Sequence, residues 1–84
     1  MVKVYLLVET AVGTARDVAS ALKELDGVES VDVVTGLYDI IALVTGQDMS
    51  AIGNVIEGKI HTVQGVLRTV TCVTVGNSKV LATR

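Results

Sequence analysis

The residues most able to do chemistry in this 84-residue sequence lie in one short segment, 35–39, which reads TGLYD. A glycine in a tight connection exposes backbone N–H and C=O groups, so Gly36 could present such groups to a ligand. Asp39 could then hold an ammonium group, and Tyr38 could shield it. An ordinary turn uses the same residue types, because Gly supplies positive φ, Asp a local hydrogen bond and Tyr a cross-strand contact. The residues alone leave both interpretations open.

Donors that suit a carboxylate lie further along the chain. Arg68 and the hydroxyl groups of Thr69 and Thr71 fall in one strand-like segment, and backbone amides are a further source. A zwitterionic amino acid needs acceptors for its amine and donors for its carboxylate. The functional interpretation of these residues, with Asp39, is therefore a site for a small amino-acid ligand.

The pattern of other reactive residues argues against catalysis. The single histidine, His61, has no catalytic partner near it in sequence, and we interpret it as a solvated residue near a helix C-terminus. The single cysteine, Cys72, lies among Thr and Val residues and is interpreted as a small buried or interface residue. No Cys or His pair has metal-ligand spacing, and one glycine before a helix is not a phosphate loop. We expect no enzyme activity, no metal and no cofactor.

Composition and charge restrict the class of protein. The chain is long enough for one domain, half of its residues are hydrophobic, and it contains no Phe, Trp or Pro. Its net charge of −2 comes from scattered residues, and its aromatic residues are two tyrosines, which disfavours nucleic-acid binding. A single cysteine, the lack of a signal-peptide pattern and the lack of a bilayer-length apolar run predict a cytoplasmic protein.

The spacing of apolar residues predicts the elements that position these side chains. Alternation is typical of strands, and recurrence every three to four residues is typical of amphipathic helices. The predicted strands cover residues 2–9, about 30–35, about 38–44 and 66–75, and the predicted helices cover 15–25 and 49–63.

Turn and capping residues support these bounds. Thr14 with Asp17 fits a capping box at the first helix, and Asp48 is a suitable N-cap for the second. Gly27 suits the left-handed position after the first helix. Glycines at 53 and 58 weaken the second helix, and we interpret them as small residues that let it lie close to a sheet.

An internal repeat connects the elements into a fold. Gly27 and Gly65 are 38 residues apart, and at the same offset Val18 corresponds to Ile56. Two similar β-α-β halves predict an α+β, ferredoxin-like βαββαβ fold, with a four-stranded antiparallel sheet and two helices on one face. We assign residues 1–75 to this domain and 76–84 to a C-terminal tail, which is either disordered or a short additional strand.

The second face of the predicted sheet carries apolar residues where polar ones are expected. They include Tyr5, Leu7, Ile41 and Leu43. Either the predicted register is imprecise, or this face packs against a second copy, sheet on sheet. We favour the second interpretation, because the aliphatic content exceeds what one small core needs.

The hairpin VVTGLYDIIALVTG, the closing segment IHTVQGVLRTVTCVTV and the order of elements resemble the effector-binding (RAM) domain of the Lrp/AsnC transcription regulators, over about residues 2–75. The resemblance implies dimers of the dimeric α+β barrel type, which can assemble into a ring of four dimers. It also implies small effectors, mostly amino acids, held by the hairpin and by the start of the last strand of a neighbouring subunit. The matching positions here are Gly36, Tyr38, Asp39, Leu67, Arg68, Thr69 and Thr71. Many members carry Asp where Leu37 stands here, so the charge of the site differs.

The regulators also carry an N-terminal helix-turn-helix, and this sequence has none. We therefore expect a stand-alone effector domain that binds neither DNA nor membranes and acts on a full-length Lrp/AsnC regulator or an enzyme by co-assembly. Two alternatives stay open. One is a dimeric α+β barrel enzyme, for which His61 is the candidate residue, and the other is a purely structural oligomerisation module.

Overall fold

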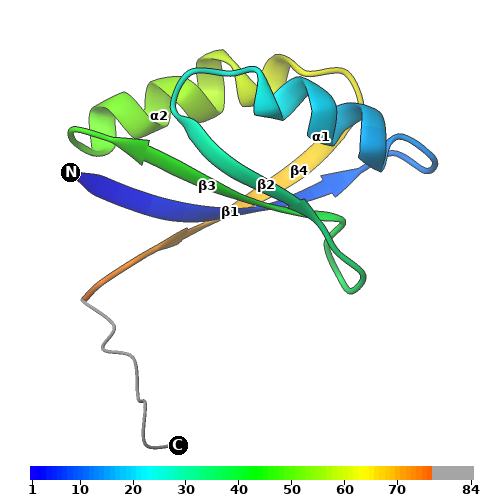
Figure 1. The fold of residues 1–84 in the computed structure, drawn as a ribbon, viewed down its shortest axis with the longest axis horizontal. Coiled ribbons are helices and arrows are strands. Elements are labelled where there is room, and N and C mark those ends of the chain that lie inside the picture. Colours follow the sequence, from blue (N-terminus) through cyan, green and yellow to red (C-terminus); the bar gives the residue numbers. More distant parts are fainter. Residues whose placement is uncertain (77–84) are drawn as a thin grey trace, which may run out of the picture.

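The fold is a single antiparallel sheet with helices on one face (Figure 1). A computed structural model describes residues 1–76. The strands pair in the order β2-β3-β1-β4, all antiparallel, which confirms the predicted ferredoxin-like βαββαβ fold. The elements are β1 (Val2–Thr10), α1 (Ala15–Lys23), β2 (Val28–Val33), β3 (Ile40–Gly46), α2 (Met49–Gly58), the 3-10 turn η1 (Ile60–Thr62) and β4 (Val66–Val73).

The core lies between the sheet and the two helices. Alternate residues of the central strands β1 and β3 point toward the helices and are fully buried, for example Leu6 and its neighbour Ala42. Leu22 of α1 and Ile52 of α2 cover them and are also fully buried. Burying one such aliphatic side chain contributes about 1.5–3 kcal/mol, so this face accounts for most of the hydrophobic stabilisation.

Several predicted bounds are wrong by a few residues. Strand β2 begins at Val28, because a bulge between Val28 and Ser30 lets it pair earlier with β3. The hairpin closes where the Val34 N–H donates to the Asp39 carbonyl, so residues 35–38 form a loop and β3 begins only at Ile40. Strand β4 ends at Val73. The predicted tail, 76–84, lies outside the described residues except for Gly76.

The second helix is shorter than its apolar pattern suggests. It ends at Gly58, and Lys59 leaves the helical region with φ −124° and ψ −56°. The chain continues as η1, which still places Ile60 fully in the core. Apolar spacing alone does not distinguish one long helix from a helix followed by a 3-10 turn.

The two predicted N-caps differ in outcome. Asp48 is confirmed as a cap, because its carboxylate accepts a hydrogen bond from the Ala51 N–H at 2.8 Å. The capping box at Thr14 is wrong, since the Thr14 hydroxyl donates backward to the Ala11 carbonyl at 2.7 Å. This hydroxyl therefore stabilises the turn before α1 and does not cap the helix.

Glycines allow the close packing of helices and sheet at positions other than those expected. Gly27 has φ +95°, which confirms its left-handed conformation, and a Cβ there would lie 2.7 Å from a methyl of Val55. At Gly46 a Cβ would lie 3.2 Å from the Cβ of Ala51 in α2. Gly53 and Gly58 have nothing within 4 Å of a Cβ, so the interpretation of these two as close-packing residues is wrong.

The other face of the sheet, called the open face below, is not covered by the helices (Figure 1). The strand register places Tyr5 between Leu43 and Cys72, and Leu7 between Ile41 and Val70, on this face. The prediction that Tyr5, Leu7, Ile41 and Leu43 share the second face of the sheet is therefore confirmed. Tyr5 is 40% exposed and Cys72 is exposed. In the described part of the chain, no helix has the length and apolar character needed to cross a membrane.

Candidate functional site

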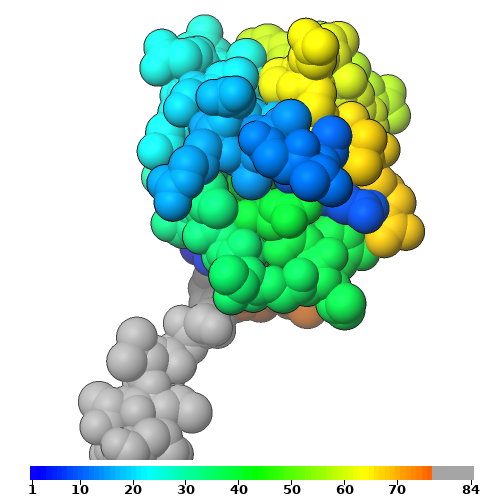
Figure 2. Space-filling view, turned by 90° about the vertical axis from the view of Figure 1, so that its right-hand side faces the viewer, coloured from blue at the N-terminus to red at the C-terminus, as the bar shows by residue number. Residues whose placement is uncertain are grey.

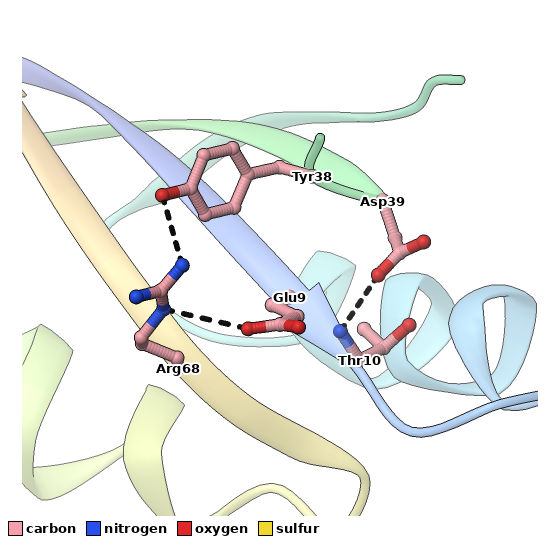
Figure 3. A network of polar contacts seen from close by, with 5 residues as sticks. All are labelled: Glu9, Thr10, Tyr38, Asp39 and Arg68. Atoms are coloured by element: carbon pink, nitrogen blue, oxygen red, sulfur yellow. Dashed lines mark hydrogen bonds and ion pairs between the residues drawn. The ribbon is translucent and has the colours of Figure 1, made fainter. Parts of the chain in front are cut away.

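The predicted hairpin and the start of β4 lie at the same end of the molecule (Figure 2). Tyr38 and Arg68, 30 residues apart in sequence, contact each other there (Figure 3). The Arg68 guanidinium donates a hydrogen bond to the Tyr38 hydroxyl at 3.3 Å, and its central carbon lies 5.7 Å from the ring centroid. This contact combines a hydrogen bond with a cation–π interaction.

Glu9 completes this cluster and was missed by the sequence interpretation. Its carboxylate lies 3.4 Å from Nε of Arg68, and the two residues are direct neighbours across β1 and β4 (Figure 3). A signal was available, because Glu9 continues the alternation of Tyr5 and Leu7 along the open face. The ion pair is exposed, so it contributes no more than about 1 kcal/mol to stability. We call Glu9, Tyr38 and Arg68 the polar cluster.

Asp39 points away from the polar cluster and has a structural partner. One of its carboxylate oxygens accepts a hydrogen bond from the Thr10 N–H at 2.8 Å (Figure 3). Pairing between β1 and β3 ends at Val8 and Ile40, so the Thr10 N–H has no strand partner on that side. The Asp39 side chain satisfies this donor and closes the end of the sheet. It also lines a surface pocket of about 630 Å³ beside the loop that precedes α1.

Thr69 and Thr71 lie on the other face of β4 from Arg68, because side chains alternate along a strand. The Thr69 hydroxyl is 2.9 Å from Nε2 of His61, which lies in η1. Both threonines and His61 line a groove of about 410 Å³ between β4 and α2. His61 is exposed, as predicted, and Thr69 is its one hydrogen-bonding partner among the described residues.

Of the remaining two predicted site residues, Leu67 borders a pocket and Gly36 is isolated. Leu67 is 63% exposed and borders a small pocket with His61 and Arg68. Gly36 has φ +152° and no neighbouring atom within 4 Å of a Cβ position. Within one subunit, the fold therefore joins Tyr38 and Arg68 and adds Glu9. Leu67 and Thr69 line a pocket with Arg68, and Gly36 and Asp39 lie apart from them. The residues described contain no group of three or more potential metal ligands.

These features define a small α+β domain with an uncovered apolar sheet face and a polar cluster at one end of it. The model of the Lrp/AsnC ligand binding domain matches residues 3–80. The chain belongs to this family, as its hairpin and closing segment suggested. No protein among curated sequences matches the chain.

Solved structures share the fold. TTHA0845 from Thermus thermophilus has a TM-score of 0.88 and 29% identity, over 94% of this chain and 99% of that chain. AsnC from E. coli has a TM-score of 0.85 and 23% identity, over 90% of this chain and 52% of that chain. The transcriptional regulator NMB0573 from Neisseria meningitidis was solved as a complex with L-Met. It has a TM-score of 0.82 and 19% identity, over 93% of this chain and 52% of that chain. The chain thus spans about half the length of the last two proteins.

Proposed function

We propose that this protein is an oligomeric amino-acid-binding module that modulates a regulator or an enzyme by co-assembly. The observation that carries the proposal is the match to a regulatory ligand-binding domain over nearly the whole chain, together with the polar cluster that this fold assembles. The family is a ligand-binding domain of transcription regulators, so the enzyme alternative has no support from it.

An amino acid is the ligand class that the charges of the cluster favour. Arg68 offers a guanidinium whose N–H groups suit a carboxylate, and Tyr38 holds it in place. NMB0573, which shares this fold, was solved with L-Met bound. The effector site therefore centres on Tyr38 and Arg68.

The hairpin residues Gly36 and Asp39 join the residues of β4 only through neighbouring subunits. Asp39 of the hairpin lines one pocket, Leu67 and Thr69 of β4 line a second with Arg68, and Thr69 and Thr71 line a third. A hairpin from one subunit placed against β4 of another would bring these surfaces together. The proposal therefore includes assembly beyond the single chain.

The open face supports dimerisation through the sheets. Its centre is apolar, with Leu7, Leu43 and Val70, while Lys3 and Glu9 lie at the two ends of the same face of β1. An apolar centre with a charged rim is the usual anatomy of a protein interface. Two such faces would pack as a sheet-on-sheet dimer of the dimeric α+β barrel type.

Native mass spectrometry tests the proposal. The protein is measured with and without a pool of the common amino acids, and a bound species is then titrated by calorimetry. We expect a homo-oligomer that retains the mass of one amino acid per site. A folded oligomer that retains none of them would contradict amino-acid binding and favour a structural oligomerisation module.

A further inference from the structure

We propose that the pocket beside the loop that precedes α1 is a binding site for a small aliphatic monocarboxylate. Residues of segment 10–17 and Asp39 line this pocket of about 630 Å³, at the end of the molecule that Figure 2 shows, and we call it the α1 pocket. The Thr10 hydroxyl, the first N–H groups of α1 and the Arg16 guanidinium bind the carboxylate. This site is separate from the effector site around Tyr38 and Arg68, and the inference goes beyond the proposed function and does not depend on it.

Thr10 carries a nearly buried hydroxyl that has no partner among the described residues. The residue is 8% exposed, and it lines the α1 pocket. Its N–H donates to Asp39, but no hydrogen bond of the described residues includes its hydroxyl. Every fully enclosed polar side-chain atom of these residues has a partner. The Thr10 hydroxyl is therefore not fully enclosed and reaches the pocket, where a ligand can supply the missing hydrogen bond.

The start of α1 adds backbone donors to the same pocket. The first hydrogen bond of the helix joins the Val18 N–H to the Thr14 carbonyl at 2.9 Å, so the N–H groups of residues 15–17 have no backbone acceptor in the described chain. The Thr14 side chain does not cap them, since its hydroxyl donates backward to Ala11. Residues 15–17 all line the α1 pocket. Free N–H groups and the helix dipole together favour an anion at this position.

The charges around the α1 pocket favour an anion with a single charge. Arg16 lines the pocket and supplies one positive charge, and its N–H donors suit a carboxylate. Asp17 and Asp39 line the same pocket and repel a second negative charge, which disfavours phosphate and sulfate. A monocarboxylate brings one charge and two acceptor oxygens, which the Thr10 hydroxyl and the helix N–H groups can share.

The remaining wall of the pocket is apolar. It is formed by Ala11, Val12 and Ala15, and Val12 is fully exposed. These side chains have no group that can bond to a polar ligand tail. A short alkyl chain that rests against them instead removes apolar surface from water. The ligand is therefore a short aliphatic acid, such as propionate.

The position of the α1 pocket is compatible with the proposed dimer. Thr10 lies on the helix-covered side of β1, in line with Leu6 and Val8, whereas Leu7 lies on the open face. Two sheets that pack through their open faces therefore leave this pocket uncovered. Binding of the acid does not compete with that interface.

Residue-resolved NMR of the intact, isotope-labelled protein tests the inference, with sodium propionate as the probe. We expect the amide protons of residues 15–17 to move downfield along a saturating curve, because a carboxylate oxygen becomes their acceptor. Sodium chloride at equal concentration controls for ionic strength. Propionamide, which has a similar shape and no charge, should bind about tenfold more weakly. The Ala51 N–H, which already bonds to Asp48, is the internal control and should not move.

Substitutions locate the bound acid. Thr10→Val removes the hydroxyl and keeps the shape of the side chain. It should raise the dissociation constant of propionate about fivefold, without loss of thermal stability, because the hydroxyl has no partner among the described residues. Arg16→Gln, on the exposed surface of α1, is a second variant and should raise the constant about twofold. Thr45→Val, at the other end of the sheet, is the matched control and should leave it unchanged.

The site and the ligand class can each be overturned. Amide shifts that sodium chloride reproduces, or an unchanged dissociation constant in a folded Thr10→Val protein, would exclude a site in the α1 pocket. If Thr10→Val does not fold, an unchanged constant in Arg16→Gln would exclude it. Tighter binding of inorganic phosphate would overturn the single-charge assignment, and leucine that shifts the same amides at lower concentration would assign the pocket to the amino-acid effector. A protein that binds propionate here but no amino acid would retain this inference and lose the proposed function.

Discussion

The two faces of the sheet carry comparable apolar side chains, but they differ in what covers them. On β1, Leu6 is fully buried under the helices, while Tyr5 on the open face remains 40% exposed. A single antiparallel sheet packed on two helices needs only one apolar face. The apolar residues of the open face are therefore not required by the fold of one chain, which fits the association that we propose for this face.

The two faces also differ in polar chemistry. Among the described residues, Thr10 is the one buried polar residue on the helix-covered side. Glu9, Tyr38 and Arg68 instead gather at the end of the open face. Alternation along β1 and β4 thus lets the same strands build a core on one side and the proposed binding surface on the other.

The largest expected change in the free energy of unfolding comes from truncating a core leucine. Leu6→Ala should lower the free energy of unfolding by about 2–5 kcal/mol, because it leaves a cavity under the helices. The matched variant Leu7→Ala removes the same atoms from the open face. Urea unfolding of the monomeric species should show a clearly smaller loss for Leu7→Ala. Equal losses would mean that the two faces do not differ in their contribution to the fold.

A charge on the open face should act on association instead. Leu7→Lys places an ammonium at the centre of the proposed interface and should raise the dimer dissociation constant about 30-fold or more, since losing a central anchor costs about 2 kcal/mol. Analytical ultracentrifugation measures this change. Val12→Lys, in a fully exposed loop, is the control and should leave the constant unchanged. A Leu7→Lys protein that dimerises normally would exclude the open face as the interface.

A smaller loss of stability is expected where a carboxylate side chain accepts a hydrogen bond from a backbone N–H that has no backbone acceptor. Asp39→Ala removes the acceptor for the partly buried Thr10 N–H and should destabilise the fold by about 1.5–3 kcal/mol. Asp48→Ala removes an equally short but exposed bond at the start of α2 and should cost about 1 kcal/mol. Thermal unfolding compares the two variants. The reverse order would show that Asp39 is not essential for closing the sheet.

The smallest expected effect on stability concerns α2, one of the two helices that cover the buried face. Gly53→Ala should stabilise the protein by about 0.5–1 kcal/mol, because a methyl there meets no neighbour and alanine favours the helix. Gly27→Ala should instead destabilise it, since Gly27 has φ +95° and a Cβ would lie 2.7 Å from Val55. Urea unfolding of both variants measures the difference. Destabilisation by Gly53→Ala would indicate a contact that α2 makes in an assembly.

Much of the fold could be predicted because its strands and helices follow from the local periodicity of apolar residues. Alternation in residues 2–9 distinguishes Leu6 from Leu7 without any structure, and the repeat that relates Gly27 to Gly65 orders the elements. The same rule also separates Arg68 from Thr69 and Thr71, which point to opposite faces of β4. The sequence interpretation placed these three in one site because all three can donate to a carboxylate and lie close together in the sequence, and the resemblance supported that grouping.

The sequence by itself thus determined the fold class, the two faces of the sheet and the family. Only the tertiary structure decided that Asp39 bonds to Thr10 and that Glu9 pairs with Arg68. The physical reason is distance along the chain. Periodicity and capping depend on residues within a few positions of each other, whereas these contacts depend on strand order, register and the point where β3 stops pairing with β1.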